Sequence, residues 1–250
     1  MHHHTMLASL LPGFRHLRTP FATGVLCALQ IWILFGEEIP QRNAASGLIL
    51  RLYELGDLAG RPVIVSFIAF ALYLMGDILK LPAVYVAAWS SKCKDVRWLP
   101  QSVRRWLFIR LSPVTPGNIH LLHELAIRRR GDRGTYPGDW IDNILKEMPE
   151  IRMRLIVNRL DVYMEHDRLG SEAEFRVNIA IYSVTLWIML AVTWSPCLLF
   201  GFVISGALYL NGVRALQQAN SVLVQALVSG IVESRVAEGV YLQPSNPHGE

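Results

Sequence analysis

Charge is scarce in this sequence, and three long stretches have none. Only 18% of the residues are Asp, Glu, Lys or Arg, whereas a typical soluble domain has about 25%. Hydrophobic residues make up 52%, and no formal charge falls in residues 19–36, 62–76 or 177–213. A helix needs roughly 17–25 mainly apolar residues to cross a bilayer. The composition therefore excludes an ordinary soluble globular protein and predicts an integral membrane protein.

Cysteine is also scarce, and motifs for catalysis or nucleotide binding are missing. The three cysteines, at positions 27, 93 and 197, form neither a CxxC site nor a framework of paired bridges. No GxSxG, P-loop or GxGxxG motif occurs. We therefore expect a protein that is not an enzyme and that binds no cofactor.

Metal-ligating residue types come close together in the stretch HLLHE. His120, His123 and Glu124 lie on neighbouring turns of an expected helix. Zinc proteases space these residue types as HExxH or HxxEH, and catalytic zinc needs a third protein ligand. Because HxxHE matches neither spacing, a surface or packing helix is the favoured interpretation, with metal binding as the alternative. The histidines at positions 2–4 are not considered as ligands.

The charge-free stretches predict four membrane-spanning helices in two pairs. The run 177–213 is too long for one crossing. Pro196 divides it into two short spans joined by a tight hairpin, since proline has no amide hydrogen and disfavours helix at the preceding residue. Asp77, Lys80 and Pro82 end the second span and leave a short interfacial segment after it. The expected spans are residues 19–36, 62–81, 177–193 and 197–212.

Lysine and arginine are distributed unequally between the two sides of this arrangement. Residues 91–176 contain 16 of them and the two tails contain four, whereas the loop 37–61 contains three. Basic residues near the ends of spans stay on the cytosolic side. The sequence therefore predicts a multi-pass protein of the cell membrane, with its N-terminus, its C-terminus and the central segment in the cytosol.

The predicted fold is all-α. We expect an integral membrane protein with four transmembrane helices in two pairs, a helical cytosolic segment between spans 2 and 3, and a helical C-terminal extension. Within the central segment, helices are expected at 100–111, after the TPGN sequence, from Asp139, and from Pro149 into the third span. The expected domains are a cytosolic tail (1–18), a transmembrane pair (19–90) with the extracellular loop 37–61, the cytosolic segment (91–176), a transmembrane hairpin (177–213) and a cytosolic C-terminal helix and tail (214–250).

Charged residues are concentrated directly before the third span. They are Glu165, Asp167, Arg168, Glu172, Glu174 and Arg176. The favoured interpretation is a solvated helix face that fixes the depth of the span, with i,i+4 pairs of opposite charge along it. The alternative requires a symmetric oligomer, in which the acidic side chains of all copies form rings at the cytosolic mouth of a cation pore. The second interpretation makes these residues candidates for permeation or gating.

Asp77 and Lys80 carry formal charge inside the second hydrophobic stretch. Ionisable groups at membrane depth are costly and are candidates for ion or proton movement. The two residues are also three positions apart and close to Pro82, so they could form an ion pair at the cytosolic end of the span. The ion pair is favoured, and a role in permeation or gating is the alternative.

Residues 100–111, PQSVRRWLFIRL, predict a basic amphipathic helix. Arg104, Arg105 and Arg110 lie away from an apolar face that includes Trp106. Such a helix suits the surface of an anionic membrane, because its cations contact lipid headgroups while tryptophan enters the interface. Nucleic acid would need a similar electrostatic surface, but no nucleic-acid-binding fold is recognisable around the helix. We expect the lipid bilayer, and not nucleic acid, as its partner.

Two patterns leave open whether helices meet within one chain or between chains. Gly24 and Ala28 in the first span, like Gly201 and Ser205 in the fourth, are small residues four positions apart, which allows close approach of helices. The segment after the fourth span would either pair with another chain or pack on the helix of residues 150–175. Its approximate heptad seam consists of Leu216, Ala219, Leu223, Ala226 and Gly230.

These features favour a self-associating membrane protein. The preferred hypothesis is a homo-oligomeric ion channel or pore-forming permeation protein, because charge lies beside and within short spans that carry small residues. The alternative is a non-conducting, membrane-anchored adaptor or regulatory protein whose cytosolic helices bind a protein partner. A symmetric oligomer in mild detergent, with ion flux that changes when Glu172 and Glu174 are neutralised, would favour the first.

Overall fold

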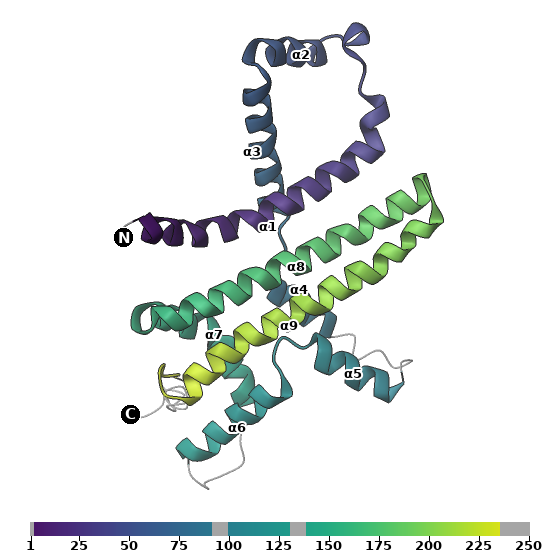
Figure 1. Cartoon of the computed structure of the whole chain (residues 1–250). Helices are drawn as coiled ribbons and strands as arrows, with labels where there is room; N and C mark the ends of the chain where they lie inside the picture. Colours follow the sequence, from purple (N-terminus) through teal and green to yellow (C-terminus); the bar gives the residue numbers. More distant parts are fainter. Residues whose placement is uncertain (1–2, 92–99, 131–138, 236–250) are drawn as a thin grey trace, which may run out of the picture. The chain divides into compact units, whose positions relative to one another are not determined.

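The computed structural model of the chain describes residues 3–91, 100–130 and 139–235 (Figure 1). All regular structure in these ranges is helical, which confirms the predicted all-α fold. Three short 3-10 helices are η1 (Gly36–Glu38), η2 (Arg42–Ala44) and η4 (Pro196–Phe200). The α-helices are α1 (His3–Phe35), α2 (Leu48–Ala59), α3 (Arg61–Leu79), α4 (Ala83–Ser91), α5 (Gln101–Leu111), α6 (Pro116–Arg130), α7 (Asp139–Asn158), α8 (Leu160–Thr193) and α9 (Gly201–Val228).

Four helical segments are long and apolar enough to cross a membrane, as predicted. They are Arg15–Glu38, Arg61–Leu79, Leu160–Thr193 and Pro196–Val228. The third and fourth predicted spans are parts of longer helices, since α8 begins at Leu160 and α9 continues to Val228. The predicted helical continuation after the fourth span is therefore the second half of α9.

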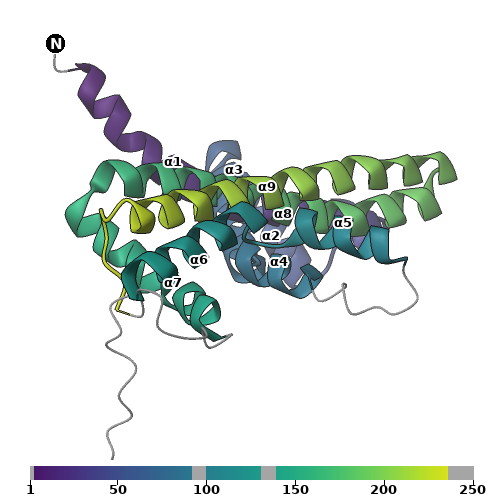
Figure 2. The same cartoon turned by 90° about the horizontal axis from the view of Figure 1, so that it is seen from below.

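The chain forms two compact units. Unit 1 consists of Met1–Ala83 with Ala173–Gly212, and unit 2 consists of Val84–Glu172 with Val213–Glu250. Each of the long helices α8 and α9 contributes one part to unit 1 and the other part to unit 2. The two helices run side by side in both views (Figure 1 and Figure 2).

In unit 1, α1 and α3 cross with their backbones in contact. A Cβ atom on Gly24 would overlap the carbonyl oxygen of Leu72, and one on Gly76 would overlap that of Pro20. In the second pair, a Cβ on Gly201 would overlap the ring of Trp187, and the hydroxyls of Ser205 and Ser183 are 2.7 Å apart. Small residues at these positions therefore bring helices together within one chain.

The sequence around Pro196 ends α8, as predicted. The amides of Trp194 and Ser195 both donate to the carbonyl of Leu190, at 2.9 and 3.3 Å, which closes the last turn. The chain then turns and enters η4. The fourth apolar segment thus starts as a 3-10 turn and becomes α-helical at Gly201.

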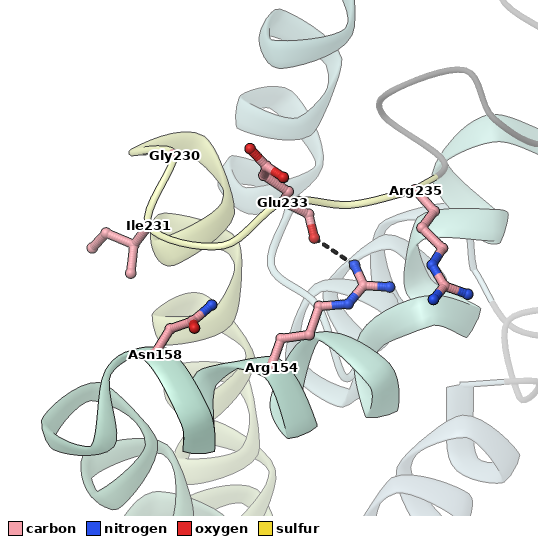
Figure 3. Close-up of a pocket in the computed structure, with 6 residues that line it drawn as sticks. All are labelled: Arg154, Asn158, Gly230, Ile231, Glu233 and Arg235. Carbon is pink, nitrogen blue, oxygen red and sulfur yellow. Dashed lines mark hydrogen bonds between the residues drawn. The ribbon is translucent and has the colours of Figure 1, made fainter.

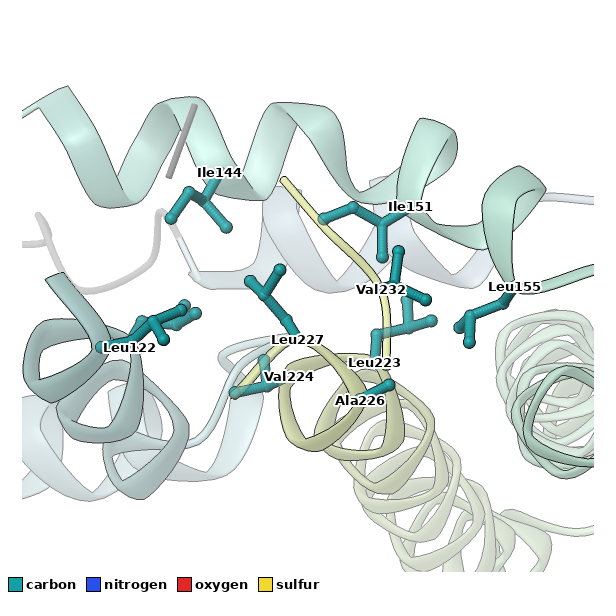
Figure 4. Packing of buried hydrophobic residues seen from close by; sticks show 10 residues of the cluster. Leu122, Ile144, Ile151, Leu155, Leu223, Val224, Ala226, Leu227 and Val232 are labelled. Carbon is teal, nitrogen blue, oxygen red and sulfur yellow. The ribbon is translucent and has the colours of Figure 1, made fainter. Parts of the chain in front are cut away.

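Unit 2 has a buried core built from α6, α7 and the second half of α9 (Figure 4). The heptad-like seam after the fourth span packs within its own chain, because Leu223 and Ala226 are buried in the same cluster as Ile151 and Leu155. The full cluster comprises Leu122, Leu125, Ile144, Ile151, Leu155, Leu223, Val224, Ala226, Leu227 and Val232.

The predicted helix start at Pro149 is wrong, because Pro149 lies inside α7. Ile144 and Ile151, on either side of the proline, are both fully buried in the core. Packing of the two flanking turns thus outweighs the missing amide hydrogen of proline. The helix is interrupted instead at Arg159, between α7 and α8.

Candidate functional site

Asp77 and Lys80 lie at the end of α3. Asp77 is on its last turn and Lys80 is the C-cap residue, and their charged groups are 3.9 Å apart. Both side chains are partly exposed, so the pair is a loose one. After Lys80 the chain leaves the helix through Leu81 and Pro82 and enters α4.

Two side chains of α8 hold this interruption in place. Asn178 accepts a hydrogen bond from the Leu81 amide and donates to the Leu81 carbonyl, each at 2.8 Å. The Tyr182 hydroxyl donates to the Leu79 carbonyl at 2.6 Å. Asn178 is fully buried and lies two residues after Arg176, where the charge-free part of α8 begins. The end of α3 is therefore fixed beside the boundary between the charged and apolar parts of α8.

Sequence reasoning missed Asn178 and Tyr182. The available signal was an asparagine near the start of an otherwise apolar run, where an amide is costly unless it is hydrogen-bonded. Its partner, the backbone of Leu81 just after α3, is 97 positions away in the chain and carried no such signal. The position of the clamp places Asp77 and Lys80 near the end of the apolar segment, which supports the ion-pair interpretation.

Several charged residues before the third apolar segment are paired within the chain. Glu165 accepts two hydrogen bonds from Arg168, at 2.9 and 2.6 Å. Asp167 accepts one from Arg152 of α7 at 3.0 Å. Arg176 donates to the carbonyl of Asn211 at 3.5 Å. Glu172 belongs to unit 2 and Glu174 to unit 1, and both are half-buried. Arginine thus compensates Glu165 and Asp167, two of the four acids that the alternative interpretation places in rings.

The helix predicted at residues 100–111 is present as α5, and Arg104, Arg105, Trp106 and Arg110 all lie on it. Trp106 is exposed, and the Arg110 guanidinium lies 5.9 Å from the centre of its ring. Two amides of α9 hold the end of α5. Gln217 donates to the carbonyls of Ile109 and Ser112 at 3.1 and 2.7 Å, and Asn220 donates to that of Pro113 at 2.8 Å.

The HLLHE stretch lies on α6 and contributes to the core of unit 2. Leu122 and Leu125 are buried, as the packing-helix interpretation predicts. His120 lies 3.6 Å from Glu124 on the exposed side of the helix. Among the residues that the structure describes, no group of three or more His, Cys, Asp or Glu side chains is arranged to hold a metal ion.

An open pocket lies where the segment after α9 meets α7 (Figure 3). Arg154 points into it and donates to the Glu233 carbonyl at 2.6 Å and to Glu147 at 3.2 Å. The buried Glu147 carboxylate also accepts hydrogen bonds from the Ser234 hydroxyl and the Arg235 amide, at 2.5 and 2.9 Å. These charges are used to hold residues 233–235 against α7. The pocket is lined by Arg154, Asn158, Gly230, Ile231, Glu233 and Arg235.

Several polar side chains in the apolar segments of unit 1 form hydrogen bonds within the unit, some to each other and more to backbone carbonyls. Gln30 of α1 donates to the Tyr182 carbonyl at 2.7 Å and accepts from the Thr185 hydroxyl at 2.9 Å. Ser183 and Ser205 join α8 to α9. The exposed surface of these segments is mainly apolar, with Phe21, Ile31, Trp32, Phe67 and Val203 among the exposed side chains.

Comparisons of the chain with protein-family models, with curated proteins and with solved structures give no match. The functional argument therefore rests on the contacts of the chain itself. These define a helical protein with four candidate membrane-spanning helices and a second unit that has its own core.

Proposed function

We propose that this protein is a non-conducting, membrane-anchored adaptor, whose spans hold a cytosolic helical unit that binds a protein partner. The observation that carries the proposal is a set of exposed apolar side chains in unit 2, which we call the corner patch. It consists of Met153 and Val157 of α7 and Leu160 and Met164 of α8. Exposed apolar patches of this kind mark interaction surfaces.

The four residues of the corner patch are four, three and four positions apart in the sequence, two before and two after the α7–α8 interruption. Val157 is 84% exposed, although it is a β-branched aliphatic residue in a well-packed unit. The patch is flanked by charges of both signs, including Arg159 paired with Asp161 at 3.1 Å. Hydrogen bonding to Asp161 raises the pKa of the Arg159 guanidinium above its ordinary value. An apolar centre with a charged rim is typical of a protein-binding surface.

Lipid is a poor occupant for the corner patch. Met164 lies twelve residues before Arg176, which corresponds to about 18 Å along α8 at the helical rise per residue. If Arg176 lies at the headgroups, the patch is surrounded by cytosol. Methionine at two of the four positions suits a partner surface, because its flexible thioether adapts to irregular shapes.

The contacts in unit 1 support a membrane anchor better than a pore formed by one chain. Ion pathways are lined by charged rings, carbonyl groups or other polar groups. Here Gln30, Ser183 and Ser205 bond to other helices of the same unit, and the exposed side chains are mainly apolar. Such a surface suits lipid better than water.

A homo-oligomeric permeation protein is the second candidate function. The observation that favours it is the exposure of α3, since only 6% of its most apolar segment is buried. That surface is open to lipid or to further copies of the chain. In an assembly of this kind, Glu172 and Glu174 would lie toward the mouth of a shared pathway.

Two measurements separate these functions. One is photo-crosslinking in cells with a crosslinking amino acid at position 157, and the other is ion flux through the purified protein in liposomes. The adaptor predicts an adduct with a second protein of defined mass, its loss when Leu160→Asp is added, and no ion flux. The matched control places the crosslinker at Ile127, an exposed apolar residue of α6 outside the patch. Flux that falls in Glu172→Gln with Glu174→Gln, without an adduct at 157, would overturn the adaptor and support permeation.

A further inference from the structure

The segment from the end of α3 to the end of α5 is strongly basic. Residues 80–111 contain seven Lys and Arg and a single Asp. A cluster of four to eight basic residues directly beside a membrane span attracts anionic lipids. The charge balance of this segment therefore points to an anionic partner.

The contacts of α5 fix its position along α9. Gln217 and Asn220, which hold the end of α5, lie one to two helical turns beyond Arg214. Arg214 is the first charged residue after the fourth apolar segment. Leu111 and Ser112 at the attachment point are buried, so this end of α5 is packed rather than loosely tethered. Figure 1 shows that α5 does not follow the direction of α9. Its attachment point thus lies close to the predicted membrane boundary.

Helix α4 also lies close to a predicted membrane boundary, the end of the second span. It begins four residues after the end of α3, directly after the clamp that Asn178 forms with Leu81. Ala87 is buried, whereas Tyr85 and Trp89 are exposed, Trp89 to 75%. Tyrosine and tryptophan are enriched at membrane interfaces, where their rings enter the headgroup region. Exposed aromatic residues beside the end of a span are therefore expected to contact lipid.

On α5, aromatic and cationic groups are adjacent. Trp106 and Ile109 are exposed, and the Arg110 guanidinium lies 5.9 Å from the Trp106 ring centre. A tryptophan at the acyl boundary and an arginine at the phosphate level is the arrangement that interfacial helices use. Arg104 and Arg105, which precede Trp106 in the same helix, add two further cations.

We propose that α4 and α5 form a binding surface for anionic phospholipids of the cytosolic leaflet. Tyr85, Trp89 and Trp106 enter the interface, and Arg104, Arg105 and Arg110 bind the headgroup phosphates. The proposal depends on the predicted threading of the chain. It holds whether the corner patch binds a partner or the spans form a permeation pathway.

The test uses the full chain, purified in mild detergent and titrated with phosphatidylglycerol or phosphatidylcholine. We expect phosphatidylglycerol to raise the midpoint of thermal unfolding and phosphatidylcholine to have little effect. Replacing Arg104, Arg105 and Arg110 together with Gln should raise the phosphatidylglycerol concentration that gives half of the maximal shift by about fivefold or more. Lysine at the same three positions should retain most of it, because charge is retained. The lysine variant also shows whether loss of binding arises from misfolding.

The matched control replaces Arg128, Arg159 and Arg168 with Gln, which removes the same charge from unit 2 outside α5. This variant should respond to phosphatidylglycerol as the unchanged chain does. An equal response of the α5 glutamine variant, or an equal response to both lipids, would overturn the proposal. A shift of the same size with inorganic phosphate alone, or tighter binding of a DNA duplex, would also overturn it.

Discussion

Gly24 and Gly76 determine how closely α1 and α3 approach each other. At both positions a Cβ atom would overlap a carbonyl oxygen of the other helix, so neither residue can be enlarged without moving a backbone. Gly206 of α9 is a contrasting case, because a Cβ there would meet nothing within 4 Å. The three glycines thus allow a steric effect to be separated from a general effect of glycine in helices.

We expect Gly24→Ala and Gly76→Ala each to destabilise the α1–α3 pair by about 1–3 kcal/mol, the usual cost of inserting atoms into a packed contact. Gly206→Ala should be neutral or stabilising by up to about 1 kcal/mol, because alanine favours helix more than glycine does. Thermal unfolding in detergent measures all three. Unchanged midpoints for both Gly24→Ala and Gly76→Ala would show that α1 and α3 are not in backbone contact.

Asn178 satisfies backbone groups that the interruption after α3 leaves without helical partners. We expect Asn178→Ala to lower the free energy of unfolding by about 1–3 kcal/mol, because the amide and carbonyl of Leu81 lose the fully buried side chain that pairs with them. Thr193→Val is the control, since that hydroxyl bonds to the Met189 carbonyl of its own helix and is exposed. Equal stability of the two variants by thermal unfolding would contradict the clamp.

At the scale of elements, α5 depends on side chains of α9. Replacing both Gln217 and Asn220 with Ala should release the end of α5 and increase amide hydrogen exchange in residues 101–111 about tenfold, since local opening becomes easier. Gln225→Ala is the control, because Gln225 bonds to Ser221 of its own helix. Unchanged exchange in α5 of the double variant would show that other contacts hold this helix.

The type of each element could be predicted from sequence because local signals dominate there. Long apolar runs, the proline after Ser195 and the amphipathic spacing of residues 100–111 gave the corresponding helices and the α8–α9 turn. The prediction was wrong at Pro149, where the core on either side of the proline keeps the helix intact. The interruption at Arg159 has no proline or glycine to mark it.

The partners of the candidate residues were harder to predict than their places on helices. The i,i+3 relation of Asp77 and Lys80 could be seen in the sequence, and the two residues do form a loose pair. Asp167 pairs with Arg152 on α7, and Arg176 bonds to a carbonyl of α9. Such contacts depend on which helix faces join, and one sequence carries little information about that.

At the scale of the whole molecule, the two units have different surfaces. Unit 1 contains most of the apolar segments, and many of its polar side chains bond internally. Unit 2 has its own core and carries both the corner patch and the aromatic and basic side chains of α4 and α5. This division agrees with the proposal that unit 1 anchors the protein and unit 2 binds other molecules.

The threading of the chain is the basis of both proposals, and thiol labelling in intact cells tests it most directly. Cysteine is introduced singly at Leu55 of α2 or at Ile127 of α6, both exposed, with the three native cysteines replaced. A membrane-impermeant maleimide should label position 55 from outside, and position 127 only after the membrane is permeabilised. Labelling of position 127 in intact cells, or protection of position 55 until permeabilisation, would contradict the account.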